Sequence, residues 1–226
     1  MKNKFLSLIL SFLIFFFVGC TDNSMKVDNK ELKDYFETTA IENKLQGNIL
    51  KLSISNSEFI QRQQSGNEVQ WESLEAYASI GALISSTKLT SSKDIDSISI
   101  CIEHNKRQEC YSYSLDELRK IASYVDICRD FLKAWGNKKF NVSRSYLSKD
   151  LLREFPTVEM FKKALSGIFL NDGIKDTKLI AFIVDGNIAG LYVNAYYDKG
   201  KAQTYIFNYL LSNRDRKIVG ITVPAD

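Results

Sequence analysis

The stretch SISICIEHNKRQECYSYSLDEL, residues 97–118, decides the fold class, because it holds a β-hairpin followed directly by the start of a helix. Apolar and polar side chains alternate from residue 97 to 103 and again from 108 to 114, which is the period of half-buried strands. The polar residues 104–107 supply the turn. Ser114-Leu115-Asp116-Glu117 then forms a capping box, which predicts the beginning of a helix.

The register of this hairpin predicts a disulfide. A turn centred on Asn105-Lys106 places Cys101 opposite Cys110, with the isoleucines and tyrosines on a core face and the serines and both cysteines on the other. Opposed residues of a non-hydrogen-bonded pair have Cα atoms about 4.5 Å apart, which a disulfide can span. The alternative is a pair of free thiols. Cys128 lies on the apolar stripe of the next helix and is expected to be a buried core residue.

Downstream of the hairpin the pattern predicts helices first and then an antiparallel meander, which is the α+β class. The helix after Ser114 can run to Trp135, and its later turns are apolar on two faces, so we expect it to be covered on two sides. Shorter helices follow between residues 140 and 170. Strands are predicted at about 177–185, 188–198, 201–211 and 216–223, with hairpin signals at Asp185-Gly186-Asn187 and Lys199-Gly200.

Upstream of the hairpin we expect a helix over residues 30–43, a strand over 49–54 and a helix over 71–89. The apolar pattern of the long helix changes near residue 123. We therefore expect a small N-terminal region of mixed α and β elements over residues 30–123 and a second α+β domain over residues 124–226. A boundary inside a continuous helix also allows the two halves to be one rigid body.

The first twenty residues, MKNKFLSLILSFLIFFFVGC, predict export. A basic start and an apolar run too short to span a bilayer are typical of a signal peptide. The ending Phe17-Val18-Gly19-Cys20 resembles a bacterial lipobox, which implies a signal peptide over residues 1–19, diacylglycerol on Cys20 and a tether over residues 20–29. We expect a lipid-anchored chain outside the cytoplasm, in the periplasm. The alternatives are an ordinary signal peptide and an uncleaved anchor.

The second half resembles a known superfamily. The run YVDICRDFLKAWGNKKFNVSRSYLS, a helix near FKKALSGIF and four closing strands are similar to the nuclear-transport-factor-two-like proteins. The resemblance implies a cone-shaped α+β domain in which a curved sheet wraps a long helix and can enclose a pocket. Pairing the strands around Lys199-Gly200 predicts a shared aromatic face that is rich in hydroxyls and includes an amide: Tyr192, Asn194, Tyr196, Tyr205, Phe207 and Tyr209. A concave face of this kind could hold a small ligand, whereas the alternative is packing on the helices or on a partner protein.

Charge and residue types exclude several functions. Without Lys2 and Lys4 the chain has 28 basic and 27 acidic residues, which gives no electrostatic footprint for nucleic acid. The single histidine, His104, lies on the hairpin turn, so the second half lacks a histidine-based triad and the usual zinc and non-haem iron ligands. We expect no catalytic residue, metal or cofactor.

The expected function is therefore a non-enzymatic envelope lipoprotein, a binding or scaffolding module held at the membrane, with a protein of the envelope as its possible partner. One alternative is a small-ligand carrier that uses the tyrosine face. Another is a carboxylate-dependent enzyme of the cone superfamily, for which Asp130 is a candidate if it is buried.

Overall fold

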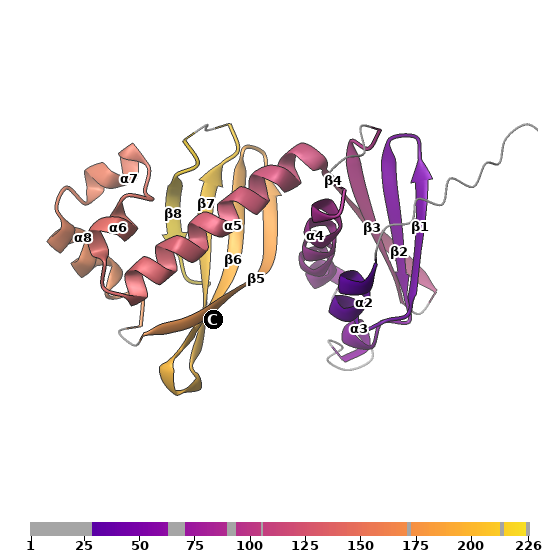
Figure 1. Cartoon of the computed structure of the whole chain (residues 1–226), viewed down its shortest axis with the longest axis horizontal. Helices are drawn as coiled ribbons and strands as arrows, with labels where there is room; N and C mark the ends of the chain where they lie inside the picture. Colours follow the sequence, from indigo (N-terminus) through magenta and orange to yellow (C-terminus); the bar gives the residue numbers. More distant parts are fainter. Residues whose placement is uncertain are drawn as a thin grey trace, which may run out of the picture.

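The computed structural model describes residues 29–62, 71–89, 94–104, 106–170, 173–212 and 215–224. The expected signal peptide, Cys20 and all but the last residue of the expected tether lie outside these ranges. Within them the chain mixes helices with two four-stranded sheets, which confirms the α+β class (Figure 1).

The N-terminal half is a four-stranded sheet with helices on one face (Figure 1). Its strands lie in the order β1-β2-β3-β4, and only the central pair, β2 with β3, is parallel. Its elements in chain order are α2 (Lys30–Phe36), β1 (Ala40–Gln46), β2 (Ile49–Ser55), α3 (Glu58–Arg62), α4 (Trp71–Thr87), β3 (Ser97–His104) and β4 (Arg107–Ser114).

The helix expected over residues 30–43 is wrong in its second half. The helix ends at Phe36, because Glu37 adopts a left-handed conformation with φ of 47° and its N–H bonds the carbonyl of Lys33. The chain then forms β1, which pairs with β2 through a turn at Gly47, where φ is 58°. The apolar pattern of residues 40–46 fits both the helical repeat and the strand repeat. Pairing with β2 decides in favour of the strand.

The hairpin of β3 and β4 has the predicted register, with Cys101 opposite Cys110 and Ile102 opposite Glu109. The isoleucines of β3 are fully buried on the face that α4 covers, and the tyrosines of β4 are half-buried there. The capping box is present as well, because the Ser114 hydroxyl accepts from the Glu117 N–H and the Glu117 carboxylate accepts from the Ser114 N–H. Local sequence is thus sufficient to specify this hairpin-to-helix unit.

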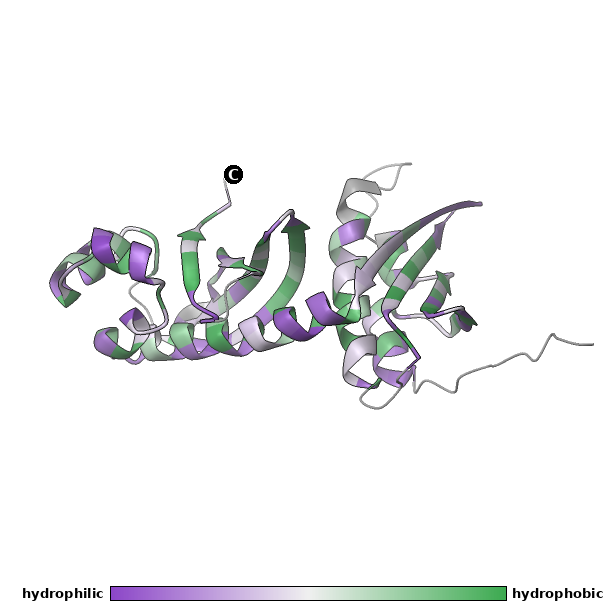
Figure 2. Ribbon diagram, turned by 90° about the horizontal axis from the view of Figure 1, so that it is seen from above, coloured by the Kyte–Doolittle hydropathy of each residue, from purple (hydrophilic) through white to green (hydrophobic). Residues whose placement is uncertain are grey.

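The C-terminal half is an antiparallel meander with helices on one face. Its elements are α5 (Leu115–Gly136), α6 (Phe140–Arg144), α7 (Lys149–Glu154), α8 (Val158–Leu165), β5 (Ile174–Asp185), β6 (Ile188–Tyr197), a 3₁₀ turn (Asp198–Gly200), β7 (Ala202–Leu210) and β8 (Ile218–Thr222). The strands pair in sequence order, and α5 crosses in front of them (Figure 1). Apolar stretches run along these strands, which lie on one side of α5 (Figure 2).

Two helices join the halves into one hydrophobic core. Helix α5 is continuous through residue 123, so the expected boundary falls inside it. Helix α4 packs against the N-terminal sheet and also against β5, where the Phe182 N–H donates to the Ser79 hydroxyl at 3.1 Å. The ring of Tyr113 meets Phe182 edge-on at 5.5 Å. Because β5 is hydrogen-bonded to α4 and the two halves share one core, moving one half relative to the other costs free energy.

No helix in the described parts of the chain is long and apolar enough to cross a membrane.

Candidate functional site

The space between α5, the short helices and the C-terminal sheet is filled by aromatic side chains. The ring of Phe131 is fully buried and lies 6.5, 5.8 and 5.6 Å from the rings of Phe161, Phe169 and Phe207. Trp135 packs on Phe161 at 5.6 Å and on Phe169 at 5.0 Å. These distances are typical of well-packed aromatic pairs. Helices and sheet therefore meet in a solid aromatic core along this part of α5.

Nearer the middle of α5, two tyrosines and a cysteine form a second buried group. The rings of Tyr124 and Tyr209 stack at 4.3 Å with nearly parallel planes, and the Tyr209 hydroxyl lies 3.1 Å from the Cys128 Sγ. Burial raises the pKa of the Cys128 thiol to about 12 and holds the pKa of Tyr209 well above its usual range. The predicted burial of Cys128 is confirmed. A neutral thiol of this kind is a poor nucleophile.

At the other end of the sheet, Tyr205 is held by three neighbours. Its ring stacks on Phe169 at 4.4 Å, its hydroxyl donates to the Gln203 side-chain oxygen at 2.7 Å, and its hydroxyl also bonds the hydroxyl of Tyr197. Burial raises the pKa of Tyr205 above its usual range. Because Tyr197 and Tyr205 satisfy each other and are almost fully buried, they act as core residues that fix β6 against β7.

The predicted tyrosine face is wrong, because the hairpin between β6 and β7 has a three-residue loop and not a two-residue one. The Tyr197 N–H bonds the Lys201 carbonyl at 2.8 Å across residues 198–200, and Gly200 has φ of 72°. Such loops place a residue with positive φ at their last position. The register therefore pairs Val193 with Tyr205, one residue away from the expected pairing of Asn194 with Tyr205. A shift of one residue moves a strand's side chains to the opposite face.

The five tyrosine and asparagine residues proposed for a pocket are consequently separated. Tyr205 and Tyr209 are fully buried in the core, whereas Tyr192, Asn194 and Tyr196 lie on the solvent side of the sheet. There Asn194 accepts a hydrogen bond from Thr204 at 2.7 Å. The sequence signal that could have shown this is the triplet Asp198-Lys199-Gly200, which is itself long enough to form the turn.

The solvent side of the C-terminal sheet forms a broad surface on which no helix of the described residues packs. We call it the outer face and define it by the side chains that point away from α5 on each strand. These are Asp176, Lys178, Ala181, Ile183 and Asp185 on β5; Ile188, Gly190, Tyr192, Asn194 and Tyr196 on β6; Ala202, Thr204, Ile206, Asn208 and Leu210 on β7; and Gly220 and Thr222 on β8. Its centre carries no charge and mixes apolar side chains with the polar side chains of Asn194, Thr204 and Asn208.

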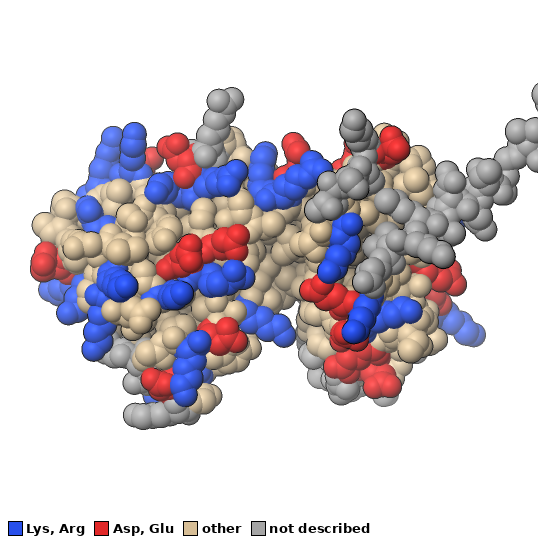
Figure 3. All heavy atoms as spheres, viewed as in Figure 1, with Lys and Arg blue, Asp and Glu red and all other residues tan. Residues whose placement is uncertain are grey.

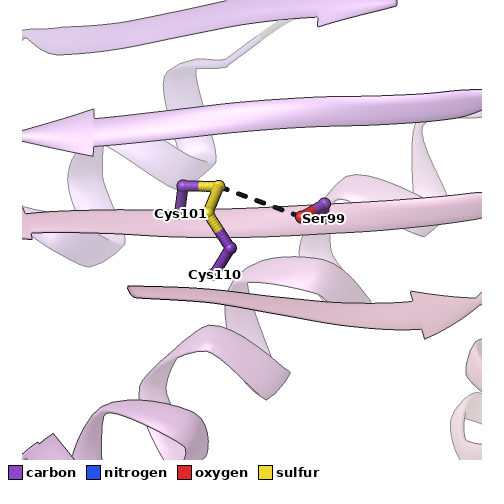
Figure 4. The surroundings of a disulfide bond; sticks show 3 residues. All are labelled: Ser99, Cys101 and Cys110. Carbon is purple, nitrogen blue, oxygen red and sulfur yellow. Dashed lines mark hydrogen bonds between the residues drawn. A yellow bond between two sulfur atoms is a disulfide. The ribbon is translucent and has the colours of Figure 1, made fainter. Parts of the chain in front are cut away.

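The second uncovered surface is the solvent side of the N-terminal sheet, where the structure joins Cys101 to Cys110 (Figure 4). Cys101 is fully buried between its neighbours, whereas Cys110 on the edge strand is exposed. The Ser99 hydroxyl lies 3.9 Å from the Cys101 Sγ (Figure 4). The predicted pairing of these cysteines is thus present, and it ties the edge strand β4 to the central strand β3.

In the part of the chain that the structure describes, carboxylates and metal ligands are not gathered in the interior. Every buried polar or charged residue of the described chain is a serine or a threonine. Asp130, the candidate for carboxylate catalysis, is exposed on α5. Within the residues that the structure describes, no three His, Cys, Asp or Glu side chains come close enough to hold a metal ion.

An open groove of about 970 Å³ lies at the start of the N-terminal half. Its walls come from α2 and from the segments around residues 37–39 and 56–58, and it contains none of the residues predicted for a pocket. Two lysines, Lys30 and Lys33, line it together with three carboxylates, Asp34, Glu37 and Glu58. The mixed charge of these walls does not select one class of ligand.

Charged side chains of both signs are interspersed on the side of the molecule that carries α5 (Figure 3). Several of them form short pairs along one helix, such as Arg129 with Asp126 at 2.9 Å. Exposed pairs of this type contribute little to stability.

Comparison with protein-family models, curated proteins and solved structures finds no match to this chain.

Proposed function

We propose that this protein is a lipid-anchored binding or scaffolding module of the bacterial envelope, without catalytic activity of its own. The observation that carries the proposal is the contrast between the two sides of the C-terminal sheet. The inner side packs on an aromatic core. Among the described residues, the outer face is covered by no helix, carries no charge at its centre and exposes Ile183, Ile188 and Tyr196. Exposed apolar side chains that gather on one surface are typical of protein interaction sites.

The proposed location rests on the sequence of the first twenty residues. Lipid on Cys20 would hold the chain at a membrane through several acyl chains, since each buried methylene contributes about 0.8 kcal/mol. An oxidising compartment agrees with the bond between Cys101 and Cys110, because disulfides persist outside the cytoplasm. We place the folded part in the periplasm.

The proposed fold of the second half is the cone-shaped type of the nuclear-transport-factor-two-like superfamily. A long helix, three short helices and an antiparallel meander in this order support it. Domains of this type can enclose a pocket between the long helix and the sheet, and aromatic rings around Phe131 pack between α5 and the sheet of this chain. A small-ligand carrier and a carboxylate-dependent enzyme both need an accessible interior, so the binding module is the better-supported function.

The test compares proteins that co-purify from detergent-solubilised native membranes. Ile188 on the outer face is 47% exposed, and Ile49 on the solvent side of the other sheet is 42% exposed, so they form a matched pair. We expect I188E to lose at least ten-fold of a partner that the wild type retains, and I49E to retain it. A wild-type protein that brings down nothing specific and turns over a substrate would contradict the proposal. Mass spectrometry of the N-terminus checks the lipid on Cys20 separately.

A further inference from the structure

The outer face has the composition of an interface centre. Ile183, Ile188 and Tyr196 are 40%, 47% and 37% exposed, and the charged side chains of the face all lie on β5, towards its two ends. Residues 124–226 contain 16 basic and 11 acidic residues, so the lack of charge over β6 and β7 is not a consequence of composition. Depletion of charge with enrichment of tyrosine marks the buried centre of protein interfaces.

The chain's own tether is not a suitable cover for this face. Residues 21–29, TDNSMKVDN, are mostly polar and would place charges against isoleucine and tyrosine. Helix α2, where the described chain begins, lies on the same near side of the molecule as α5 (Figure 1). The outer face points to the opposite side. Two anchored chains could therefore meet through this face while both tethers remain free to reach one bilayer.

The size of the face suits a weak dimer. Four strands at about 4.8 Å spacing and five rows of side chains at about 6.8 Å spacing give a footprint of about 500 Å². An axis that lies between the third and fourth rows overlaps four of the five, so two copies would bury about 800 Å², the size of a weak contact. Attachment to one membrane raises the effective concentration of each copy near the other and can make such a contact sufficient.

Two neighbouring rows of side chains across the face differ in size. One row across the sheet holds Ala181, Tyr192, Ile206 and Thr222, and the next row holds Ile183, Gly190, Asn208 and Gly220. A twofold axis between the two rows would place Tyr192 of each copy over Gly190 of the other. On β7 it would place Ile206 over Asn208, whose side-chain amide lies between Gly190 and Gly220.

The same twofold axis would bring opposite charges on the β5 strands of the two copies together. Lys178 lies one row before Ala181 and Asp185 one row after Ile183, so both are equally far from the axis. Each lysine would therefore face the aspartate of the second copy. Complementary charge at the rim of an interface fixes its register.

From this pattern we propose that the outer face binds the outer face of a second copy of this chain, about a twofold axis that lies between the Tyr192 row and the Gly190 row. The inference rests on the proposed binding function and names its partner. Helix α4 covers the free edge of β5 and leaves the rows on β6 and β7 accessible.

The test uses the full-length chain in bacterial membranes, with a single cysteine introduced by Y192C. Cys101 and Cys110 are bonded to each other and Cys128 is fully buried, so among described residues the new thiol is the accessible one. A bismaleimide with a spacer of about 10 Å, the distance between packed sheets, should give a cross-linked dimer. The matched control I49C should stay monomeric. Sedimentation of the detergent-solubilised chain should show at least ten-fold weaker association for Y192E and less than two-fold change for I49E.

The outcomes separate the dimer from the general binding function. Equal dimer yields from the two cysteine variants, or no dimer from Y192C, would overturn the proposal. A cross-link from Y192C to a different protein would overturn the second copy as partner and leave a binding function in place. Absence of any adduct, together with no co-purifying partner, would overturn both. If Y192C lowers the melting temperature by more than a few degrees, I206C, which lies beside Tyr192 in the same row, replaces it under the same criteria.

Discussion

Replacing Phe131 with alanine tests whether the interior of the C-terminal half is solid. The ring is fully buried and lies within 6.5 Å of three other aromatic rings. Removing a ring of this size from a packed core costs about 3–5 kcal/mol, from lost transfer free energy and from the cavity that remains. For a chain of this length each kcal/mol lowers the melting temperature by about 2–4 °C, so we expect a decrease of about 6–20 °C.

The assay is urea unfolding followed by tryptophan fluorescence, since Trp135 packs within the same aromatic group. The control is V142A, because Val142 is 45% exposed and its truncation should change the free energy of unfolding by less than about 0.5 kcal/mol. A new apolar cavity should also bind benzene, which would raise the melting temperature of F131A and leave that of the wild type unchanged. A loss below about 1 kcal/mol for F131A would refute a packed interior and favour the ligand carrier.

Three further perturbations probe the other structural elements. Replacing both Cys101 and Cys110 with serine should lower the free energy of unfolding by about 2–3 kcal/mol under oxidising conditions, because the disulfide closes a short loop in the unfolded chain. Equal stability of this variant and the wild type in urea would contradict this expectation. S114A removes one half of a capping box and should cost about 1 kcal/mol, measured by the same unfolding curves. The pKa of Cys128 is about 12 in the folded chain and 9.0 for an ordinary thiol, so the folded state retains its proton more strongly and stability should fall as pH rises from about 9 to 12. C128A should show a shallower decline over that range, by up to about 1.4 kcal/mol per pH unit; an identical slope in the two proteins would show that the thiol is not responsible.

Local pattern was sufficient where a segment's own residues set its geometry. Strict alternation on both sides of a polar turn fixed the β3–β4 register, and Ser114 with Glu117 fixed the start of α5. The α+β class followed from the order of these elements. Where the pattern fitted two periods, as in residues 40–46, pairing with a neighbouring strand decided the outcome.

The candidate site could not be predicted in the same way, because it depends on one residue of loop length. Counting two residues in the turn between β6 and β7 puts Tyr192 and Tyr205 on one face, whereas counting three puts them on opposite faces. Both counts agree with the sequence around Gly200. The hydrogen bond between Tyr197 and Lys201 and the packing of Tyr205 on Phe169 select the second.

The sequence by itself determined the class of the fold, which follows from the order of its elements. It also determined the pairing of Cys101 with Cys110 and the buried position of Cys128, which follow from periodicity within neighbouring residues. Only the tertiary structure decided which tyrosines are buried and which side of the C-terminal sheet is uncovered. Those properties arise from contacts between residues far apart in the chain, such as Phe131 with Phe207, whose strength depends on how rings pack in three dimensions.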